Sequence, residues 1–185
     1  MKKSLLMICA SFFAAQLVQA NLLKNGSFEE MGSSDEIASQ WKMNEPDEHG
    51  DAWGSAVRKD WRAHEGSWQG VIQGTWSGMD DYGGFWQEVP GTAGTTYILT
   101  AWFYADGSWT ANQQELKIEF FNEDRTTQLG SEVVSLSDVS EVWTQKTVEA
   151  LAPEGTAYVR VVINVSGAGS DGALQVDEVE LDTAW

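Results

Sequence analysis

The chain has 185 residues, and its 28 Asp and Glu against 11 Lys and Arg give a formal net charge of −17. This charge excludes a nucleic-acid partner, because a phosphate backbone is held by clustered Lys and Arg, and it disfavours an anionic membrane surface. Hydrophobic residues make up 42% of the chain, which is enough for one core, so we expect a single domain. Ten Trp and 18 Gly residues predict a turn-rich β structure rather than disorder.

Residues 1–20 have the pattern of a secretory signal peptide. Two lysines precede an apolar run, and Val18 and Ala20 stand at the −3 and −1 positions of a cleavage site. The run is too short to span a bilayer. We therefore expect a mature domain of residues 21–185, secreted to the extracellular medium or the periplasm without membrane insertion. The single cysteine, Cys9, falls in the leader, so the mature domain is expected to have no disulfide.

After the leader, short runs of alternating apolar and polar residues are separated by clusters of Gly, Asp, Asn and Ser, which is typical of an all-β protein. Residues 32–82 are less regular and predict long loops around one or two short strands. The clearest predicted strands cover residues 96–104, 115–121, 157–165 and 174–181. In the last of them the apolar phase changes between Val176 and Val179, which predicts a β-bulge near Asp177.

Motifs along most of the mature chain resemble carbohydrate-binding modules of families 4/9 and 22. They are the opening Asn-Leu-Leu-Lys-Asn-Gly-Ser-Phe-Glu-Glu at 21–30, a His-Glu-Gly-Ser step at 64–67, a Gln, Pro-Gly, Tyr and Trp block at 87–104, and the closing Val-Asp-Glu-Val-Glu-Leu at 176–181. The first of these would be the opening strand. The resemblance implies a galactose-binding-like jelly roll, which is a β-sandwich of two antiparallel sheets. It also implies non-catalytic binding of a polysaccharide or oligosaccharide.

Sugar rings have apolar C–H faces and hydroxyl rims, so proteins bind them with flat aromatic rings and planar polar groups. The candidate aromatic ligands are Trp102 and Tyr104 on the strand at 96–104 and the loop residues Trp53, Trp61, Trp76 and Trp109. The candidate polar ligands are Lys117, Glu119, Arg160 and Asn164, provided that their outward faces line the same sheet.

Two simpler interpretations stand beside these candidates. Tryptophan in a β-sandwich usually belongs to the core, which we predict for Trp41, Trp68 and Trp143. A pair such as Lys117 and Glu119 is otherwise typical of a solvated strand face with cross-strand ion pairing.

The resemblance also implies a structural calcium site at one end of the sandwich. The carboxylates of Glu29 and Asp177 would bind the ion, and the carbonyls of Asn25 and Gly66 would complete its shell of oxygen ligands. Such an ion would tie together the two ends of a domain without disulfides. Alternatively, Asp177 only caps a bulge and Glu29 is solvated.

Catalysis is not expected, because the chain carries no Gly-x-Ser-x-Gly, His-Glu-x-x-His or P-loop motif. Its two histidines, His49 and His64, stand apart in the sequence, and we expect His64 to be a packed loop residue rather than a base.

The charge also bears on the ligand. Without the two leader lysines, 9 basic residues remain against 28 acidic ones, or −19. This charge would repel acidic glycans unless Lys117, Arg160 or the neighbours Arg58 and Lys59 form a positive patch, so it favours neutral β-glucans or xylans. The alternative function is a secreted structural or adhesive surface protein that uses the same fold for protein or matrix contacts.

Overall fold

The computed structural model describes residues 21–43, 55–74 and 82–184, which form ten strands and no helix. In this part of the chain there is accordingly no helix that could cross a membrane. The predicted signal peptide and the candidate ligands Trp53 and Trp76 lie outside the described residues, as does His49. The strands are β1 (Lys42–Met43), β2 (Ser55–Lys59), β3 (Gln69–Gln73), β4 (Tyr82–Pro90), β5 (Thr96–Ala105), β6 (Gln113–Phe121), β7 (Gln128–Ser135), β8 (Thr144–Leu151), β9 (Tyr158–Ser166) and β10 (Ala173–Thr183).

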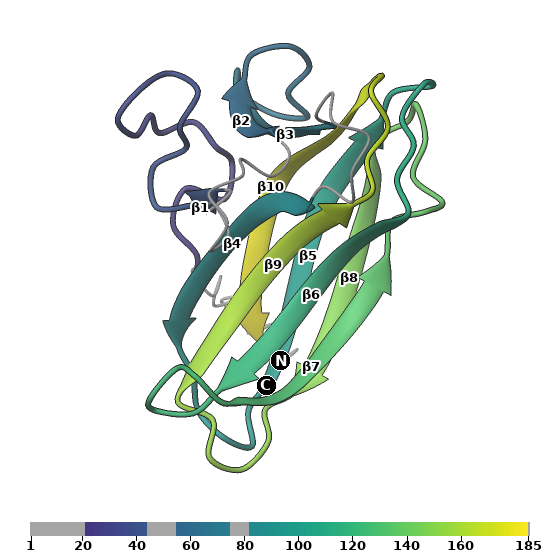
Figure 1. The fold of residues 1–185 in the computed structure, drawn as a ribbon. Helices are drawn as coiled ribbons and strands as arrows, with labels where there is room; N and C mark the ends of the chain where they lie inside the picture. Colours follow the sequence, from purple (N-terminus) through teal and green to yellow (C-terminus); the bar gives the residue numbers. More distant parts are fainter. Residues whose placement is uncertain (1–20, 44–54, 75–81, 185) are drawn as a thin grey trace, which may run out of the picture.

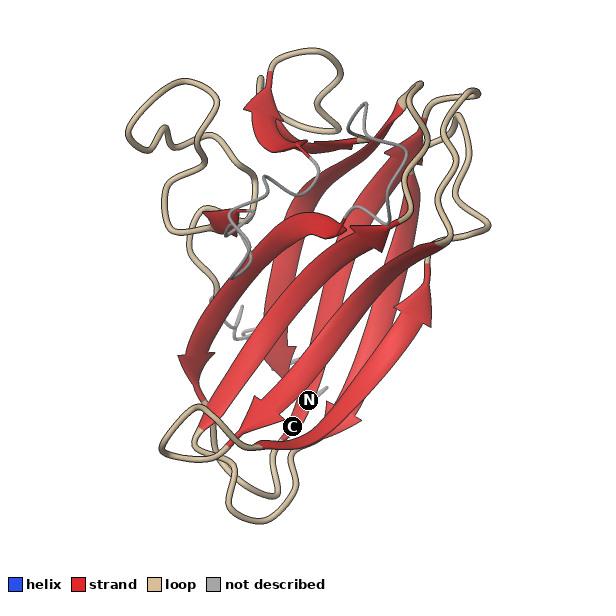
Figure 2. Cartoon of the chain, viewed as in Figure 1, coloured by secondary structure: helices blue, strands red, loops and turns tan. Residues whose placement is uncertain are grey.

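The strands form two antiparallel sheets that pack face to face (Figure 1). Sheet I has the strand order β1-β4-β9-β6-β7, and sheet II has the order β2-β3-β10-β5-β8. Loops join the strands at both ends of the sandwich (Figure 2). The predicted all-β sandwich is confirmed.

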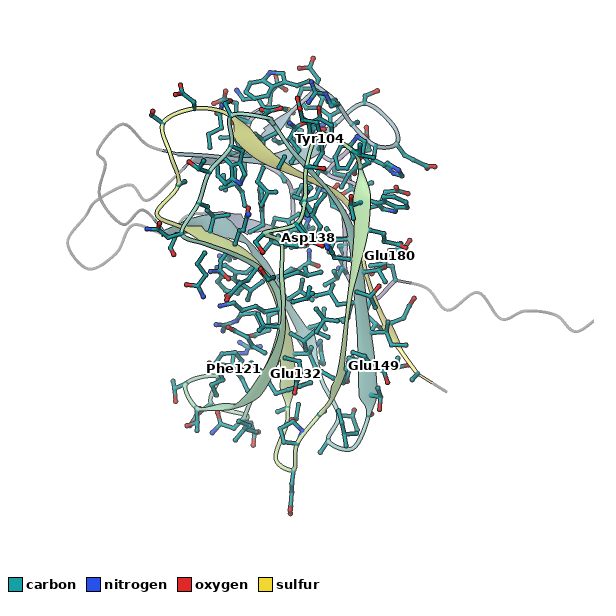
Figure 3. All side chains as sticks on the ribbon, turned by 90° about the vertical axis from the view of Figure 1, so that its right-hand side faces the viewer. Tyr104, Phe121, Glu132, Asp138, Glu149 and Glu180 are labelled. Carbon is teal, nitrogen blue, oxygen red and sulfur yellow. The ribbon has the colours of Figure 1, made fainter. Side chains whose placement is uncertain are left out.

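The alternating residues of the long strands build the core between the layers. Along β5 every second side chain is buried, with Leu99, Ala101 and Phe103 fully enclosed, and Val161 and Ile163 of β9 face them from sheet I. Each such Val, Leu, Ile or Phe side chain contributes about 1.5–3 kcal/mol by leaving water. The view in Figure 3 shows side chains filling the space between the layers, with Phe121 on one flank and Glu149 and Glu180 on the opposite one.

The four predicted long strands match β5, β6, β9 and β10. The bulge is confirmed as well, because the register between β10 and β5 shifts between Asp177 and Glu180. The described residues between 32 and 82 contain three short strands, β1 to β3, before β4 begins. This is one more than the upper end of our expectation.

The opening strand predicted for residues 21–30 is wrong. This segment runs through bends and turns, and left-handed backbone at Asn25 (φ 53°) and Phe28 (φ 59°) prevents a regular ladder. Its backbone groups make isolated hydrogen bonds instead of a continuous ladder. The amide of Leu22 donates to the carbonyl of Leu181 at 2.9 Å, and the carbonyl of Gly26 accepts from the amide of Val179 at 2.9 Å.

Of the three tryptophans predicted for the core, only Trp41 is buried there, stacked on Phe28 with ring centroids 5.3 Å apart. Trp68 is half-buried under the guanidinium of Arg58, which lies 3.6 Å from the ring centroid. Trp143 is also half-buried and lies outside the core. The predictions for Trp68 and Trp143 are wrong because both rings pack on polar or aromatic side chains outside the two layers.

Candidate functional site

The outer face of sheet I brings together the four predicted polar ligands. On β9, Arg160 lies directly between Glu88 of β4 and Glu119 of β6 in the strand register. Lys117 lies on β6, two residues before Glu119, and Asn164 lies on β9, four residues after Arg160. Because side chains two and four residues apart on a strand point to the same side, these groups share one face.

Arg160 lies at the centre of this face. Its guanidinium carbon is 4.1 Å from the ring centroid of Phe121 and 4.6 Å from that of Trp86. Its Nη2 donates to Oε2 of Glu88 at 3.0 Å. Its Nε is buried and has no hydrogen-bond partner among the described residues. The described chain therefore leaves this Nε–H donor of Arg160 unsatisfied.

Trp86 is absent from the residues that the sequence predicted as ligands. It lies on β4 between two buried neighbours, Phe85 and Gln87, and is itself only half-buried. This alternation was the available signal, because it places the Trp86 ring on the side of the strand opposite to Phe85. The outer face of sheet I thus has an aromatic ring beside its polar groups.

Asn164 adds a second unpartnered group. Its Oδ1 is buried without a hydrogen-bond partner in the described part of the chain. Its cross-strand neighbours are Gly84 on β4 and Glu115 on β6. A buried acceptor without a partner costs about 1–3 kcal/mol, and a hydroxyl group of a ligand would remove this cost.

Glu119 completes the polar set. Burial raises the pKa of its carboxyl, while the positive charges of Lys117 and Arg160 lower it in part. Lys117 itself pairs with Glu115, Nζ to Oε2 at 2.6 Å. The face thus offers both donors and acceptors at its centre.

An open groove of about 790 Å³ lies beside this face, at the edge formed by β1 and β4. Trp86, Glu88 and Arg160 line the groove on the side of the sheet. Its other lining residues are Leu22, Lys24, Gln40, Lys42, Gln87, Val89, Pro90 and Arg125.

Trp102 and Tyr104 do not join this site. They lie on β5, which belongs to sheet II, so they are on the opposite side of the sandwich from Arg160. The condition that the four polar candidates line the same sheet as Trp102 is therefore not met. The alternation within each strand is readable from the sequence, but the sheet to which a strand belongs is set by long-range pairing.

The rings on sheet II are covered by the chain itself. His64 stacks on Trp102 with ring centroids 4.1 Å apart and an interplanar angle of 16°, and it also meets the edge of Trp143 at 5.4 Å. The guanidinium of Arg62 lies 4.2 Å from the ring centroid of Tyr104. His64 is thus a packed loop residue, as predicted, and it also pairs with Glu178.

The two remaining described candidates differ from each other. Trp109 is buried, with 8% of its surface exposed, and its Nε1 donates to Oε1 of Gln114 at 2.7 Å. Its prediction as an exposed loop ring is therefore wrong, because its indole N–H finds an internal acceptor. Trp61 is 53% exposed in the loop between β2 and β3, with Nζ of Lys59 5.6 Å from its ring centroid. It lies away from the groove residues.

Glu29 and Asp177 are held by one loop. Oε1 of Glu29 accepts the backbone N–H groups of Ser67 and Trp68 at 2.7 and 2.8 Å. Oδ2 of Asp177 accepts those of His64 and Glu65 at 2.8 and 3.1 Å. Both carboxylates therefore fix the loop that covers Trp102.

Carboxylate oxygens such as those of Glu29 and Asp177 are the type of ligand that a hard cation prefers. Asp177 is fully buried, burial raises its pKa to about 6, and its carboxylate accepts from the backbone N–H groups of His64, Glu65 and Glu178 rather than from cationic side chains. Gly66 between them has left-handed backbone (φ 68°), and a Cβ there would come within 2.3 Å of Oε1 of Glu29. Glycine thus allows the close approach of that carboxylate.

Asn25 fits less well. Its carbonyl oxygen already accepts from Nε1 of Trp41 at 2.8 Å and from the amide of Phe28 at 3.1 Å, which uses both of its lone pairs. Within the described ranges, no group of three or more His, Cys, Asp or Glu side chains is placed to hold a metal. An ion at Glu29 and Asp177 would therefore need backbone carbonyls as further ligands, which calcium accepts.

No protein-family model matches the chain, and no curated protein sequence matches it. Solved structures do match. A family 16 carbohydrate-binding module has a TM-score of 0.60 at 19% identity, over 88% of this chain and 99% of that one. A family 4 module gives 0.59 at 17%, over 88% and 99%. A family 61 module in complex with β-1,4-galactotriose gives 0.56 at 18%, over 90% and 100%.

Enzymes share the fold too. The enzymatically active domain of a bacteriophage CBA120 tailspike protein matches with a TM-score of 0.66 at 16% identity, and this chain spans 21% of its length. A Stig cyclase from Fischerella sp. TAU matches with 0.61 at 15%, over 89% of this chain and 96% of that one. At such identities the likeness shows the fold alone, which is the jelly roll of carbohydrate-binding modules.

Proposed function

We propose that this protein is a non-catalytic polysaccharide-binding module of the family 4/9 or 22 type, and that it holds its glycan on the outer face of sheet I. Trp86 would stack on the apolar face of one sugar ring. Arg160 and Glu119 would bond hydroxyl groups at this ring, and Asn164, about 13 Å further along β9, would bond those of a neighbouring sugar unit.

One observation carries this proposal: Nε of Arg160 and Oδ1 of Asn164 are buried without partners beside a half-buried Trp ring. A folded chain normally satisfies such groups internally. An unsatisfied donor, an unsatisfied acceptor and an aromatic ring on the same side of one sheet are the kinds of group that bind a sugar chain.

The proposal is tested by affinity electrophoresis on a panel of polysaccharides that includes xylan, β-glucan and galactan. We expect retardation by at least one of them. It should be lost in Trp86→Ala and reduced in Asn164→Ala. Trp102→Ala is the matched control, because it removes the same ring from the covered face. The proposal fails if no glycan retards the protein, or if Trp102→Ala weakens binding as much as Trp86→Ala does.

Neutral glycans are the first ligands to test, because a chain of this net charge repels acidic polymers at long range. The same panel addresses the two alternatives. Self-association that is indifferent to added sugar would favour the adhesive role, and new reducing ends after incubation would indicate an enzyme.

We also propose that Glu29 and Asp177 bind a structural calcium ion, with the carbonyl of Gly66 as a further ligand. Support comes from the buried Asp177 carboxylate, whose hydrogen-bond donors in the described chain are backbone N–H groups and not cationic side chains. A cation that binds only the folded state raises the melting temperature. Melting is therefore measured in calcium and in chelator, with Asp177→Asn as the variant that should no longer respond. Equal melting temperatures for the natural chain in both buffers would contradict the proposed calcium site.

Secretion is part of the same proposal, since the glycan would be met outside the cell. It rests on the signal-peptide pattern of residues 1–20. N-terminal sequencing of exported protein should give Asn21 as the first residue.

A further inference from the structure

The groove beside Trp86 gathers positive charge in a strongly acidic molecule. Four of the nine basic residues that follow position 20 line it, namely Lys24, Lys42, Arg125 and Arg160. One carboxylate, that of Glu88, lines it with them. With Glu119 counted as well, because it neighbours Arg160 on the sheet, these six residues have a formal charge of +2.

The other five basic residues are used differently. Arg58 is buried and donates to the backbone carbonyls of Phe28, Glu29 and Asp35. The remaining four each pair with a separate carboxylate: Lys59 with Glu36, Arg62 with Asp106, Lys117 with Glu115, and Lys146 with Asp138. Outside the groove, the described cations are thus neutralised or enclosed.

Within the groove, Glu88 forms ion pairs with two arginines. Its Oε1 accepts from Nε of Arg125 at 2.9 Å, and its Oε2 accepts from Nη2 of Arg160 at 3.0 Å. Lys24 and Lys42 are exposed and make no ion pair with any other described residue. Four cations therefore share one lining carboxylate.

The two lysines are positioned by the backbone. Gln87 accepts from the amide of Lys24 at 2.8 Å and donates to its carbonyl at 2.9 Å, which fixes the N-terminal segment beside β4. Lys42 lies directly opposite Trp86 in the pairing of β1 with β4. The backbone of both lysines is thereby fixed at the rim of the groove that the Trp86 ring lines.

We infer that this groove binds the anionic groups of an acidic polysaccharide, which are uronate carboxylates or sulfate esters. The inference rests on the proposed function and replaces its neutral ligand with an acidic one. A planar guanidinium and mobile ammonium groups are the side chains that recognise such anions. The acidic remainder of the molecule would disfavour contact elsewhere, so the charge also orients the polymer toward this groove.

The test is isothermal titration of the full chain with four oligosaccharides: an oligogalacturonide, a sulfated carrageenan fragment, a xylo-oligosaccharide and a β-gluco-oligosaccharide. We expect an acidic ligand to bind about tenfold more tightly than either neutral one at 50 mM NaCl, and to lose most of this advantage at 300 mM, because salt screens exposed charges. The two acidic ligands distinguish carboxylate from sulfate.

The decisive variant is the double change Lys24→Gln and Lys42→Gln. It should weaken the acidic ligand about five- to tenfold and change the neutral ligands less than twofold. The control is Lys59→Gln with Lys146→Gln, which alters the net charge equally but on residues paired with Glu36 and Asp138. It should leave both classes within about twofold.

Equal loss in the two double variants would overturn the inference, because only the net charge would then matter. Tighter binding of a neutral oligosaccharide that still depends on Trp86 would also overturn it and leave the proposed function standing. If none of the four ligands binds and the polysaccharide panel is also negative, the proposed function itself fails.

Discussion

Both outer faces of this sandwich carry aromatic rings beside arginine side chains, but the rings are covered on one face and border a groove on the other. On sheet II, the rings of Trp102 and Tyr104 are covered by His64 and Arg62 from the loop between β2 and β3. On sheet I, the ring of Trp86 borders an open groove. An aromatic residue beside an arginine is therefore not by itself a binding site. What matters is whether the chain supplies all the partners of these groups or leaves some for a ligand.

The largest expected effect is on the covered face. Trp102→Ala should lower the free energy of unfolding by about 2–3 kcal/mol, because the stacked His64 ring loses its support and the ring's buried area is lost. Glycan affinity should stay within about twofold. Urea denaturation and titration check the two values, and a large loss of affinity would show that the faces are not separate.

Trp86→Ala should give the opposite pattern. We expect glycan affinity to fall by about 2 kcal/mol, or roughly thirtyfold, because the stacking area of the indole is lost. The free energy of unfolding should change by less than about 1 kcal/mol, because the ring is only half-buried. Trp86→Phe should recover part of the affinity. An unchanged affinity in Trp86→Ala would show that the Trp86 ring does not contact the glycan.

On the covered side, the buried carboxyl of Asp177 predicts a pH dependence of stability. Burial raises the pKa of Asp177 from its ordinary 3.8 to about 6, so the folded state holds this proton more tightly than the unfolded state does. The resulting stabilisation is complete below pH 4 and is lost as the pH rises through 6. In chelator, Asp177 should make the protein more stable at pH 5 than at pH 7 by about 1 kcal/mol.

Urea denaturation at the two pH values measures this difference in the natural chain and in Asp177→Asn. The difference between the two proteins isolates Asp177 from the other carboxyls. Saturating calcium should also abolish it, because a bound cation keeps the carboxylate ionised. The same pH dependence in Asp177→Asn would assign the effect elsewhere.

The smallest effects come from a matched pair of arginines. Arg62 lies over Tyr104 and pairs with Asp106 on the covered side, whereas Arg125 lies over Tyr158 and pairs with Glu88 at the groove. Both side chains are about half exposed, so each change to Gln should cost less than about 1 kcal/mol of stability. Only Arg125→Gln should weaken binding of an acidic glycan, by about two- to threefold in titration. Equal affinities for the two variants would place Arg125 outside the site.

Part of the candidate site was readable from the sequence. The alternation in β6 and β9 placed Lys117, Glu119, Arg160 and Asn164 on outward faces, and these strands do lie side by side. The ring that accompanies them, Trp86, was equally readable from the alternation in β4. It was missed because the prediction favoured tryptophans in loops. One of these, Trp109, is buried.

By itself, the sequence determined that the protein has two layers. Strands with alternating apolar residues have one apolar face each, and sheets built from such strands bury that face by packing on one another. It also determined the bulge near Asp177, since the apolar phase changes there. Only the tertiary structure decided which sheet each strand joins, and therefore that Trp102 and Arg160 face opposite ways. It alone decided that a loop from residue 62 onward covers one face. It also brought four cations from four separate segments to one groove, because pairings between distant segments are set by the packing of the whole chain.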